Sequence, residues 1–229
     1  LMHANNETGA LQPLAGYAEV LKNHDAYFHV DAAQSFGKEI VSLLEKRIDL
    51  ISCSAHKLYG PKGIGALILR RRKYKRPSIE PLMVGGGQER GLRPGTLPVH
   101  QIAGFGVAAQ LALENHQQRK EVCLEIKREA LEAFGKLPIQ YHSPMEALSS
   151  TLNFSISGVN SEAAIISLKG LAAVSNGSAC TSSSYTPSHV LSAMGLGEAD
   201  VDGALRFSWC HMTGEVPWEK IVDRLQLLL

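Results

Sequence analysis

The sequence of 229 residues predicts an α/β fold that continues into a smaller α+β region. Short apolar runs alternate with helical patterns through the first hundred residues, which is typical of a mainly parallel sheet covered by helices. A long helical stretch follows, and beyond Pro138 the pattern changes to compact α+β. We therefore expect a large domain over residues 1–97, a long connecting helix over 98–135 and a small α+β domain over 136–229.

The elements expected in the large domain follow from local patterns. Apolar residues at helical spacing predict a helix over 13–23, and a mostly apolar run predicts a buried strand over 26–30. Further elements are a partly helical stretch over 38–47, a strand over 49–54 and a strand over 65–70 bounded by glycine and proline. The basic run RRRKYKR at 70–76 is expected to be a solvated turn.

The second half of the chain is interpreted in the same way. Pro98 can occupy the first turn of the long helix and Gly135 can end it. Ser161 and Ser188 each precede a helical pattern and are expected to begin helices there. The other expected elements are strands over 151–157, 172–175 and 204–209, helices over 161–169 and 189–194, and a final helix over 217–229.

Composition excludes several classes of protein. Hydrophobic residues make up 45% and charged residues 20% of the chain, as in an ordinary globular protein. The net charge of +1 and the short basic run give no reason to expect nucleic-acid binding. No apolar run approaches the roughly 18 residues that span a bilayer, so no membrane partner is expected. The four cysteines have neither a disulfide framework nor zinc spacing, which favours a reducing, cytoplasmic location.

Two predicted strands end in residues that could carry chemistry. Lys57 follows one strand, and a lysine held partly dry at a sheet edge can form a Schiff base with an aldehyde. Ser54 and His56 precede it and could donate to a phosphate. Asp31 ends the other strand, with Gln34 just beyond, and its carboxylate could pair with a protonated pyridine nitrogen. Alternatively, Lys57 is only solvated and Asp31 caps the turn that follows it.

Two residues of the second half complete the set of candidates. Cys180 lies in the Gly- and Ser-rich stretch NGSACTSSS, which predicts an exposed, reactive thiol on a flexible loop. Arg206 interrupts an apolar strand and needs a carboxylate partner, which could belong to a substrate or to an internal acid. Cys53, Cys123 and Cys210 lie in a strand, on a helix and at a strand end, and are interpreted as structural.

The motifs occur together in one order: MHANNETG, HVDAAQS, SCSAHKLYGPKGIGAL, GGGQERGLRPGTLPVHQ, NGSACTSSS and LRFS. In this combination the chain resembles the cysteine desulfurases of the class V, fold-type I pyridoxal-phosphate enzymes. The short Ser-rich cysteine loop is similar to the NifS-like subgroup that assembles iron–sulfur clusters. The resemblance implies an enzyme that converts L-cysteine to L-alanine and holds the sulfur as a persulfide.

The resemblance implies a role for each candidate. Lys57 would bind pyridoxal 5'-phosphate as a Schiff base and transfer protons, and Cys180 would attack the sulfur. Asp31 would pair with the pyridinium nitrogen, Gln34 with the phenolic oxygen, and Ser54 and His56 with the phosphate. Thr96 would reach the phosphate of the other subunit of a homodimer. Asn6 would contact the cofactor and, with Arg206, the substrate carboxylate. Cys180 is also a candidate ligand of a transient iron–sulfur cluster shared with a partner.

The resemblance also implies that the family's N-terminal part, with its first strands and a stacking histidine, is missing from this chain. Neither His3 nor His29 is assigned to that histidine. The expected partner is a sulfur-acceptor or scaffold protein, in iron–sulfur cluster assembly, tRNA thiolation or DNA sulfur modification. Two alternatives stay open: an enzyme similar to selenocysteine lyase, and a non-catalytic remnant that keeps dimerisation or partner binding.

Overall fold

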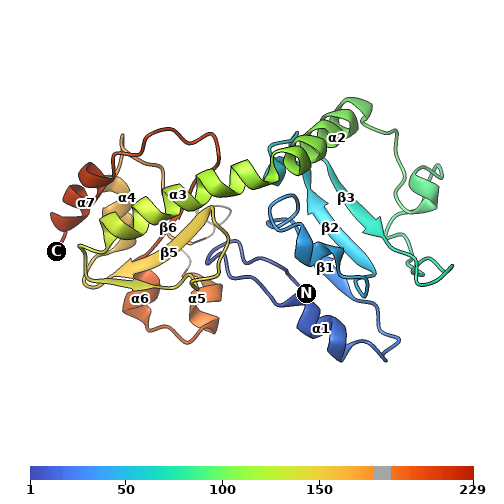
Figure 1. The fold of residues 1–229 in the computed structure, drawn as a ribbon, viewed down its shortest axis with the longest axis horizontal. Helices are drawn as coiled ribbons and strands as arrows, with labels where there is room; N and C mark the ends of the chain where they lie inside the picture. The colour runs from blue at the N-terminus through green and yellow to red at the C-terminus, as the bar shows by residue number, and fades with distance from the viewer. Residues whose placement is uncertain (178–186) are drawn as a thin grey trace. The chain divides into compact units, whose positions relative to one another are not determined.

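The computed structural model of the protein describes residues 1–177 and 187–229. The chain forms two compact units (Figure 1). Unit 1 contains Leu1–Ala4 and Gln12–His116, and unit 2 contains Asn5–Leu11 and Gln117–Leu229. A short N-terminal segment, residues 5–11, therefore folds with the C-terminal half of the chain.

Unit 1 is built on a three-stranded sheet of β1 (His29–Asp31), β2 (Leu50–Ser54) and β3 (Gly65–Leu69), in that order. β1 and β2 are parallel, and a parallel bridge from Met2 to Asp31 extends the sheet beyond β1. β3 runs antiparallel to β2, so the sheet is mainly parallel, as expected, with one antiparallel edge strand. The reason is the connection over 55–64, which is shorter than the roughly dozen residues of a parallel crossover.

Helices cover the sheet of unit 1 where the sequence predicted them, with shorter bounds. α1 (Leu14–Val20) and the 3₁₀ helix η1 (Val41–Leu44) pack with β1 and β2. Their buried cluster consists of Leu14, Ala18, Phe28, Val30, Ala32, Leu43, Ile48 and Ile51. A second 3₁₀ helix, η2 (Ala55–Leu58), contacts α2 (Val99–Glu114) through Leu58, Ala108 and Ala112. A third, η3 (Glu89–Gly91), lies in the glycine-rich stretch.

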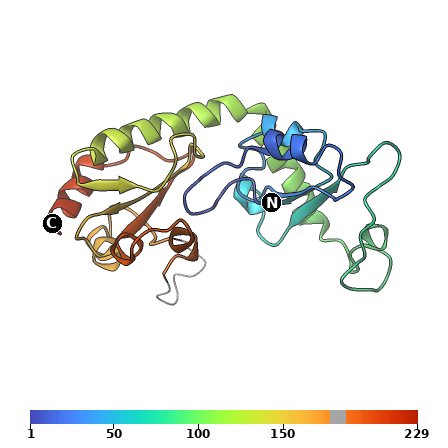
Figure 2. The same ribbon diagram turned by 90° about the horizontal axis from the view of Figure 1, so that it is seen from below.

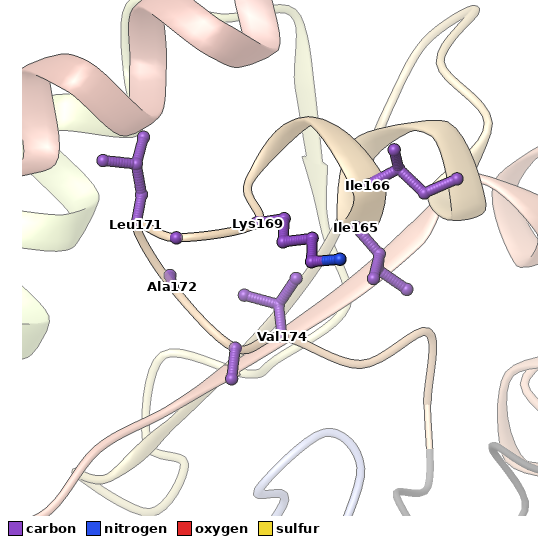
Figure 3. A pocket seen from close by; sticks show the side chains of 8 residues that line it. Ile165, Ile166, Lys169, Leu171, Ala172 and Val174 are labelled. Atoms are coloured by element: carbon purple, nitrogen blue, oxygen red, sulfur yellow. The ribbon is translucent and has the colours of Figure 1, made fainter.

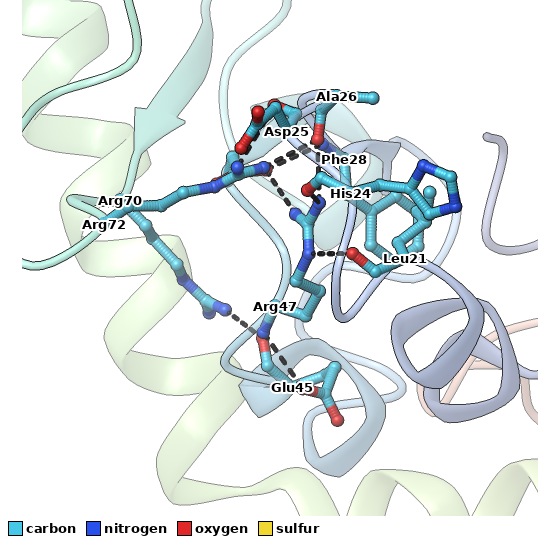
Figure 4. Close-up of polar contacts among 10 residues, drawn as sticks. Leu21, His24, Asp25, Ala26, Phe28, Glu45, Arg47, Arg70 and Arg72 are labelled. Atoms are coloured by element: carbon cyan, nitrogen blue, oxygen red, sulfur yellow. Dashed lines mark hydrogen bonds and ion pairs between the residues drawn. The ribbon is translucent and has the colours of Figure 1, made fainter.

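A buried carboxylate ties the strands of unit 1 to the following loops. Asp49 is 2% exposed and accepts hydrogen bonds from the Phe28 N–H, from Arg47 Nη1 at 2.7 Å and from Arg72 Nε at 2.5 Å. Arg70 donates to main-chain oxygens of η1 and the loop beyond it, and Arg47 and Arg72 both donate to the Ala26 oxygen (Figure 4). Arg70 and Arg72 of the basic run therefore have structural contacts, which gives part of its positive charge a role in the fold.

Unit 2 contains an antiparallel sheet of β4 (Ile139–Tyr141), β5 (Thr151–Ile156) and β6 (Ala204–Ser208). In both ribbon views α3 (His116–Phe134) lies on one side of the strands, and α5 (His189–Ala193) and α6 (Glu198–Asp202) lie on the other (Figures 1 and 2). Every residue of the central strand β5 is buried, because both of its faces are covered. The remaining helices are α4 (Ser161–Ser167) and α7 (Trp218–Gln226).

Aromatic rings fill the centre of unit 2. Phe134 of α3 lies 4.8 Å from Phe154 and 5.0 Å from Phe207, measured between ring centroids. Trp218 of α7 meets Phe134 edge-on at 5.5 Å. Offset and edge-on pairs of this kind add to the stabilisation from buried area. The sheet and its two long helices therefore share one core.

Local chemistry explains several differences from the expected boundaries. The long helix is divided into α2 and α3 at Asn115, whose side-chain Nδ2 donates to the Leu111 oxygen at 3.0 Å. Asn160 caps α4, with Oδ1 accepting from the N–H groups of the next turn, where Ser161 was expected to do so. The cap of α5 by Ser188 is confirmed. The strand expected over 172–175 is wrong, because among the described residues this segment pairs only at Ser175, with Arg206.

Candidate functional site

The carboxyl ends of β1 and β2 meet at one edge of the unit 1 sheet. Asp31, the last residue of β1, is the register partner of Ser52, and the Ala32 N–H continues the ladder to the Ser52 oxygen. Ser54 ends β2, and Lys57 follows within η2. Because β1 and β2 are parallel, these residues share the sheet edge at which α/β folds bind ligands. The expected placement of Asp31 and Lys57 on neighbouring strand ends is confirmed.

Asp31 is exposed and has one carboxylate oxygen available. Its Oδ1 accepts a hydrogen bond from the Ala33 N–H at 2.9 Å, which makes it the cap of the following turn. Oδ2 accepts no hydrogen bond from the residues that the structure describes. Turn capping and ligand binding are therefore compatible at Asp31, since each uses a different oxygen. Gln34 lies half-buried in the same turn.

Lys57 is half-buried, and its amine makes no hydrogen bond or ion pair within the described part of the chain. Its backbone is fixed by the buried neighbours Ala55 and Leu58 on either side. The Gly60 N–H closes the turn by donating to the Ala55 oxygen at 2.9 Å. A Cβ at Gly60 would lie 3.1 Å from both that oxygen and the Ala108 side chain, so the close turn favours glycine.

Two potential phosphate donors precede this lysine. Ser54 is half-buried and His56 is exposed, and neither side chain has a hydrogen-bond partner among the residues described. An amine, an imidazole and a hydroxyl on one sheet edge, with a carboxylate on the next strand, suit a ligand that carries both an anion and a basic ring nitrogen. This donor set fits pyridoxal phosphate.

A histidine that the sequence left unassigned supports the same edge from inside. His3 is 1% exposed, and its Nδ1 lies 2.8 Å from the hydroxyl of buried Ser35. The main-chain N–H of His3 donates to the main-chain oxygen of Asp31 at 2.9 Å. Burial lowers the pKa of the His3 imidazole. His3 thus connects the backbone of Asp31 to the turn that carries Gln34, a contact that sequence spacing gives no means of predicting.

The segment of residues 5–8 forms a tight turn within unit 2. Asn5 Oδ1 accepts from the N–H groups of Glu7 at 2.8 Å and Thr8 at 2.9 Å, so Asn5 holds the turn. Arg206 Nη1 donates to the Asn6 main-chain oxygen at 2.8 Å. The Asn6 side-chain amide has no partner among the described residues. Asn6 and the half-buried Arg206, proposed to hold a carboxylate together, are therefore neighbours within this unit.

The remaining candidates are Cys180, Thr96 and the three other cysteines. Cys180 lies outside the described residues, as does its proposed role as a cluster ligand. Thr96 is exposed, and its role toward a second subunit stays a prediction. Among the residues described, no group of three or more histidine, cysteine or acidic side chains could hold a metal ion. Cys53 and Cys123 are buried thiols and Cys210 is half-buried, which agrees with the structural interpretation of all three.

An apolar hollow of about 560 Å³ lies elsewhere in unit 2, between α4 and the segment that follows it (Figure 3). Its lining consists of Ile165, Ile166, Lys169, Gly170, Leu171, Ala172, Ala173 and Val174. It holds one charged side chain and no carboxyl, hydroxyl or imidazole group. The hollow therefore lacks the polar groups that cofactor chemistry needs.

None of the described helices has the length and apolar character that crossing a lipid bilayer requires.

Comparisons with known proteins agree with this geometry. A family model described as Aminotransferase class-V matches residues 1–215. The chain is 42% identical over 229 residues to the "Cysteine desulfurase IscS" of Vibrio cholerae, covering 99% of this chain and 56% of that protein. It is also 42% identical over 217 residues to the protein of the same name from Haemophilus influenzae, covering 94% of this chain and 53% of the relative.

Solved structures show the same relationship. DndA from Streptomyces lividans superposes with a TM-score of 0.78 at 41% identity, over 92% of this chain and 60% of that one. A NifS-like protein from Rickettsia africae reaches a TM-score of 0.86 at 29% identity, over 99% of this chain and 60% of the other. The chain thus spans little more than half the length of the relatives it matches.

Proposed function

Since this chain belongs to the aminotransferase class-V family, we propose that it carries the active-site residues of a pyridoxal-phosphate-dependent cysteine desulfurase. The substrate is L-cysteine, the first product is L-alanine, and the sulfur stays on Cys180 as a persulfide. The observation that carries the proposal is the shared sheet edge of Asp31 and Lys57, with the Lys57 amine unpaired among the residues described. The names of the relatives support the choice of reaction.

The proposed transfer balances without another reactant. The Cys180 thiolate attacks the sulfur of cysteine, a sulfur–sulfur bond forms, and the carbon–sulfur bond of the substrate breaks. The electron pair of that bond goes to the substrate's β-carbon, which takes up a proton and becomes the methyl group of alanine. The Cys180 sulfur and the transferred sulfur are oxidised to the persulfide level, and the carbon is reduced.

Each residue of this chain contributes a separate task. Lys57 Nζ binds the cofactor and moves protons at the substrate's α- and β-carbons. Asp31 Oδ2 keeps a proton on the cofactor's ring nitrogen, while Gln34 contacts the phenolic oxygen and Ser54 and His56 bind the phosphate. The cofactor, when bound, supplies the electron sink that the α-carbon needs.

Two further residues are proposed to contact the substrate carboxylate. Arg206 is proposed to hold the substrate carboxylate by charge-assisted hydrogen bonds, with the Asn6 amide as a second donor. Its Nη1 donates to the Asn6 main-chain oxygen at 2.8 Å, so the two residues are neighbours within unit 2.

The proposal extends to partners and location. The persulfide is delivered to a sulfur-acceptor or scaffold protein, and a transient iron–sulfur cluster at Cys180 is the proposed intermediate for cluster assembly. Thr96 reaches the phosphate of a second subunit in a homodimer. A reducing cytoplasm suits this chemistry, because an oxidising compartment would consume both the thiol and the persulfide.

The test uses the native protein, supplied with pyridoxal phosphate and L-cysteine. We expect alanine and sulfide to form in equal amounts in the presence of a reducing thiol. Cys180→Ala should stop both, whereas Cys210→Ala, at a half-buried thiol, should leave them unchanged. Full alanine production by Cys180→Ala would refute the persulfide role. Faster turnover of L-selenocysteine than of L-cysteine would instead favour the lyase.

A further inference from the structure

Glu7 is a buried acid for which the proposed reaction has no use. Its side chain lies in unit 2 and is 1% exposed, next to Asn6 in the turn that Asn5 holds. A buried carboxyl group needs hydrogen-bond donors to offset its lost hydration. The Ser188 hydroxyl donates to Glu7 Oε2 at 2.5 Å. The two residues are separated by 181 positions in the chain, so this contact exists only in the folded unit.

Ser188 has a second role at the same time. Its hydroxyl oxygen accepts a hydrogen bond from the Leu191 N–H at 3.1 Å and thereby caps α5. Donation to Glu7 fixes the hydroxyl hydrogen, which leaves the lone pairs of the oxygen for the helix. The start of α5 is consequently tied to the turn that presents Asn6.

Residues 175–177, which precede Cys180 in the sequence, also lie close to the Glu7 carboxyl group. Ser175 pairs with Arg206 through backbone hydrogen bonds of 2.6 and 3.3 Å, and its hydroxyl donates to the Gly177 oxygen at 3.1 Å. A Cβ built on Gly177 would lie 3.2 Å from Glu7 Oε2, and the φ angle of +140° is one that favours glycine. Residues 175–177 and 188 therefore both lie against the Glu7 turn.

We infer that Glu7 is a positioning residue that fixes both stems of the segment carrying Cys180, and sets them relative to the Asn6–Arg206 pair. The inference rests on the proposed function only for its consequence, the efficiency of sulfur transfer. Its structural content, restraint of the two stems, is independent of catalysis. Glu7 touches neither substrate nor cofactor in this role and acts through Ser188.

The direct test is the rate at which iodoacetamide alkylates Cys180, measured by peptide mass spectrometry on the native protein. Glu7→Gln keeps the shape of the side chain but weakens its hydrogen bond, and Ser188→Ala removes the donor. We expect each to raise the Cys180 alkylation rate by about threefold to tenfold, as the net contribution of one ordinary hydrogen bond allows. Ser188→Thr retains the hydroxyl and should restore the rate to within about twofold of the parent.

The matched control is Asn160→Ala, which removes the cap of α4 in the same unit without touching Glu7. It should leave Cys180 alkylation unchanged. Buried Cys53 and Cys123 report folding in the same experiment, because they stay unmodified while their units are folded. Equal Cys180 rates in Glu7→Gln, Ser188→Ala and Asn160→Ala, with Cys53 and Cys123 protected, would overturn the inference. If Ser188→Ala exposes Cys123, Glu7→Gln and Ser188→Thr decide the question.

A kinetic measurement tests the consequence. Glu7→Gln should lower kcat for alanine formation by about fivefold or more while KM for cysteine changes by less than about twofold, because the Arg206 contact to the Asn6 main chain is retained. A larger effect on KM than on kcat would contradict the assignment. If the variants show the alkylation differences but the parent protein forms no alanine, the proposed function is refuted and the positioning role is supported.

Discussion

Arg206 and Asn6, 200 positions apart in the chain, meet through a hydrogen bond of 2.8 Å from the guanidinium Nη1 to the main-chain oxygen. The contact lies within unit 2, to which residues 5–11 belong. The contact brings residues 5–11 next to β6, the strand that carries the arginine proposed to bind the substrate carboxylate. The predictions below begin with this pair.

Arg206→Lys should weaken substrate binding more than catalysis. Lysine keeps the positive charge but loses the planar fork that holds a carboxylate through two hydrogen bonds. We expect KM for L-cysteine to rise by about tenfold to a hundredfold, corresponding to the loss of one charge-assisted hydrogen bond. Steady-state kinetics measures the change. Arg128→Lys, at an exposed arginine of α3, is the control and should leave KM unaltered.

Lys57→Ala should abolish the visible absorbance of the cofactor bound to lysine and lower turnover by at least about a hundredfold, the usual contribution of a positioned proton-transfer group. Absorbance spectra and alanine release measure the two effects. Lys62→Ala replaces an exposed lysine a few residues further along and should retain both properties. A Lys57→Ala protein with the parent spectrum would show that another amine binds the cofactor.

Asp49→Asn should destabilise unit 1 without affecting the chemistry directly. The substitution keeps the shape of the side chain but leaves Arg47 and Arg72 without their carboxylate. We expect a loss of about 2–3 kcal/mol in the free energy of unfolding, below the usual range for a fully buried pair because Arg72 is partly exposed. Urea unfolding followed by circular dichroism measures it. Glu125→Gln, which removes an exposed ion pair, should give no resolvable change.

Acid should remove the contribution of Asp49. Burial by itself would raise the pKa of this carboxyl group, but hydrogen bonds from Arg72, the Phe28 N–H and Arg47 hold the pKa below its ordinary value. A lowered folded-state pKa means that the stabilisation is complete above the unfolded-state pKa of about 4 and is lost as the pH falls through the lower folded value. Unfolding curves of the parent protein and of Asp49→Asn should therefore converge with decreasing pH. A constant difference down to pH 2 would contradict the role.

His142 should make unit 2 less stable in mild acid. Burial lowers the pKa of its imidazole, and the Asp200 carboxylate offsets part of that shift. The unfolded chain therefore binds a proton near pH 6.5 that the folded chain does not, so stability should fall below about pH 6.5 and stay level above about pH 7.5. His142→Gln should reduce the slope by up to about 1.4 kcal/mol per pH unit. Parallel slopes in urea unfolding at pH 5.5, 6.5 and 7.5 would refute this.

Much of the candidate site followed from local patterns. Asp31 and Lys57 both come directly after apolar runs, and the parallel pairing of β1 and β2 then puts them at one edge. The direction of β3 was less predictable, because strand patterns carry no information about polarity and the short connection decides it. The segment 172–175 is apolar enough to be a strand, yet its surroundings give it a single bridge to Arg206.

The sequence by itself determined which groups are candidates for chemistry: an amine and a carboxylate at strand ends, an arginine in an apolar strand, and a cysteine among small polar residues. Those properties depend on residue type and local periodicity, which a linear sequence contains. Only the tertiary structure decided that Asn6 lies beside Arg206, that His3 supports Asp31, and that Glu7 binds Ser188. The physical reason is that a buried polar group takes as its partner whichever donor the packed core brings to it, at any separation in the chain.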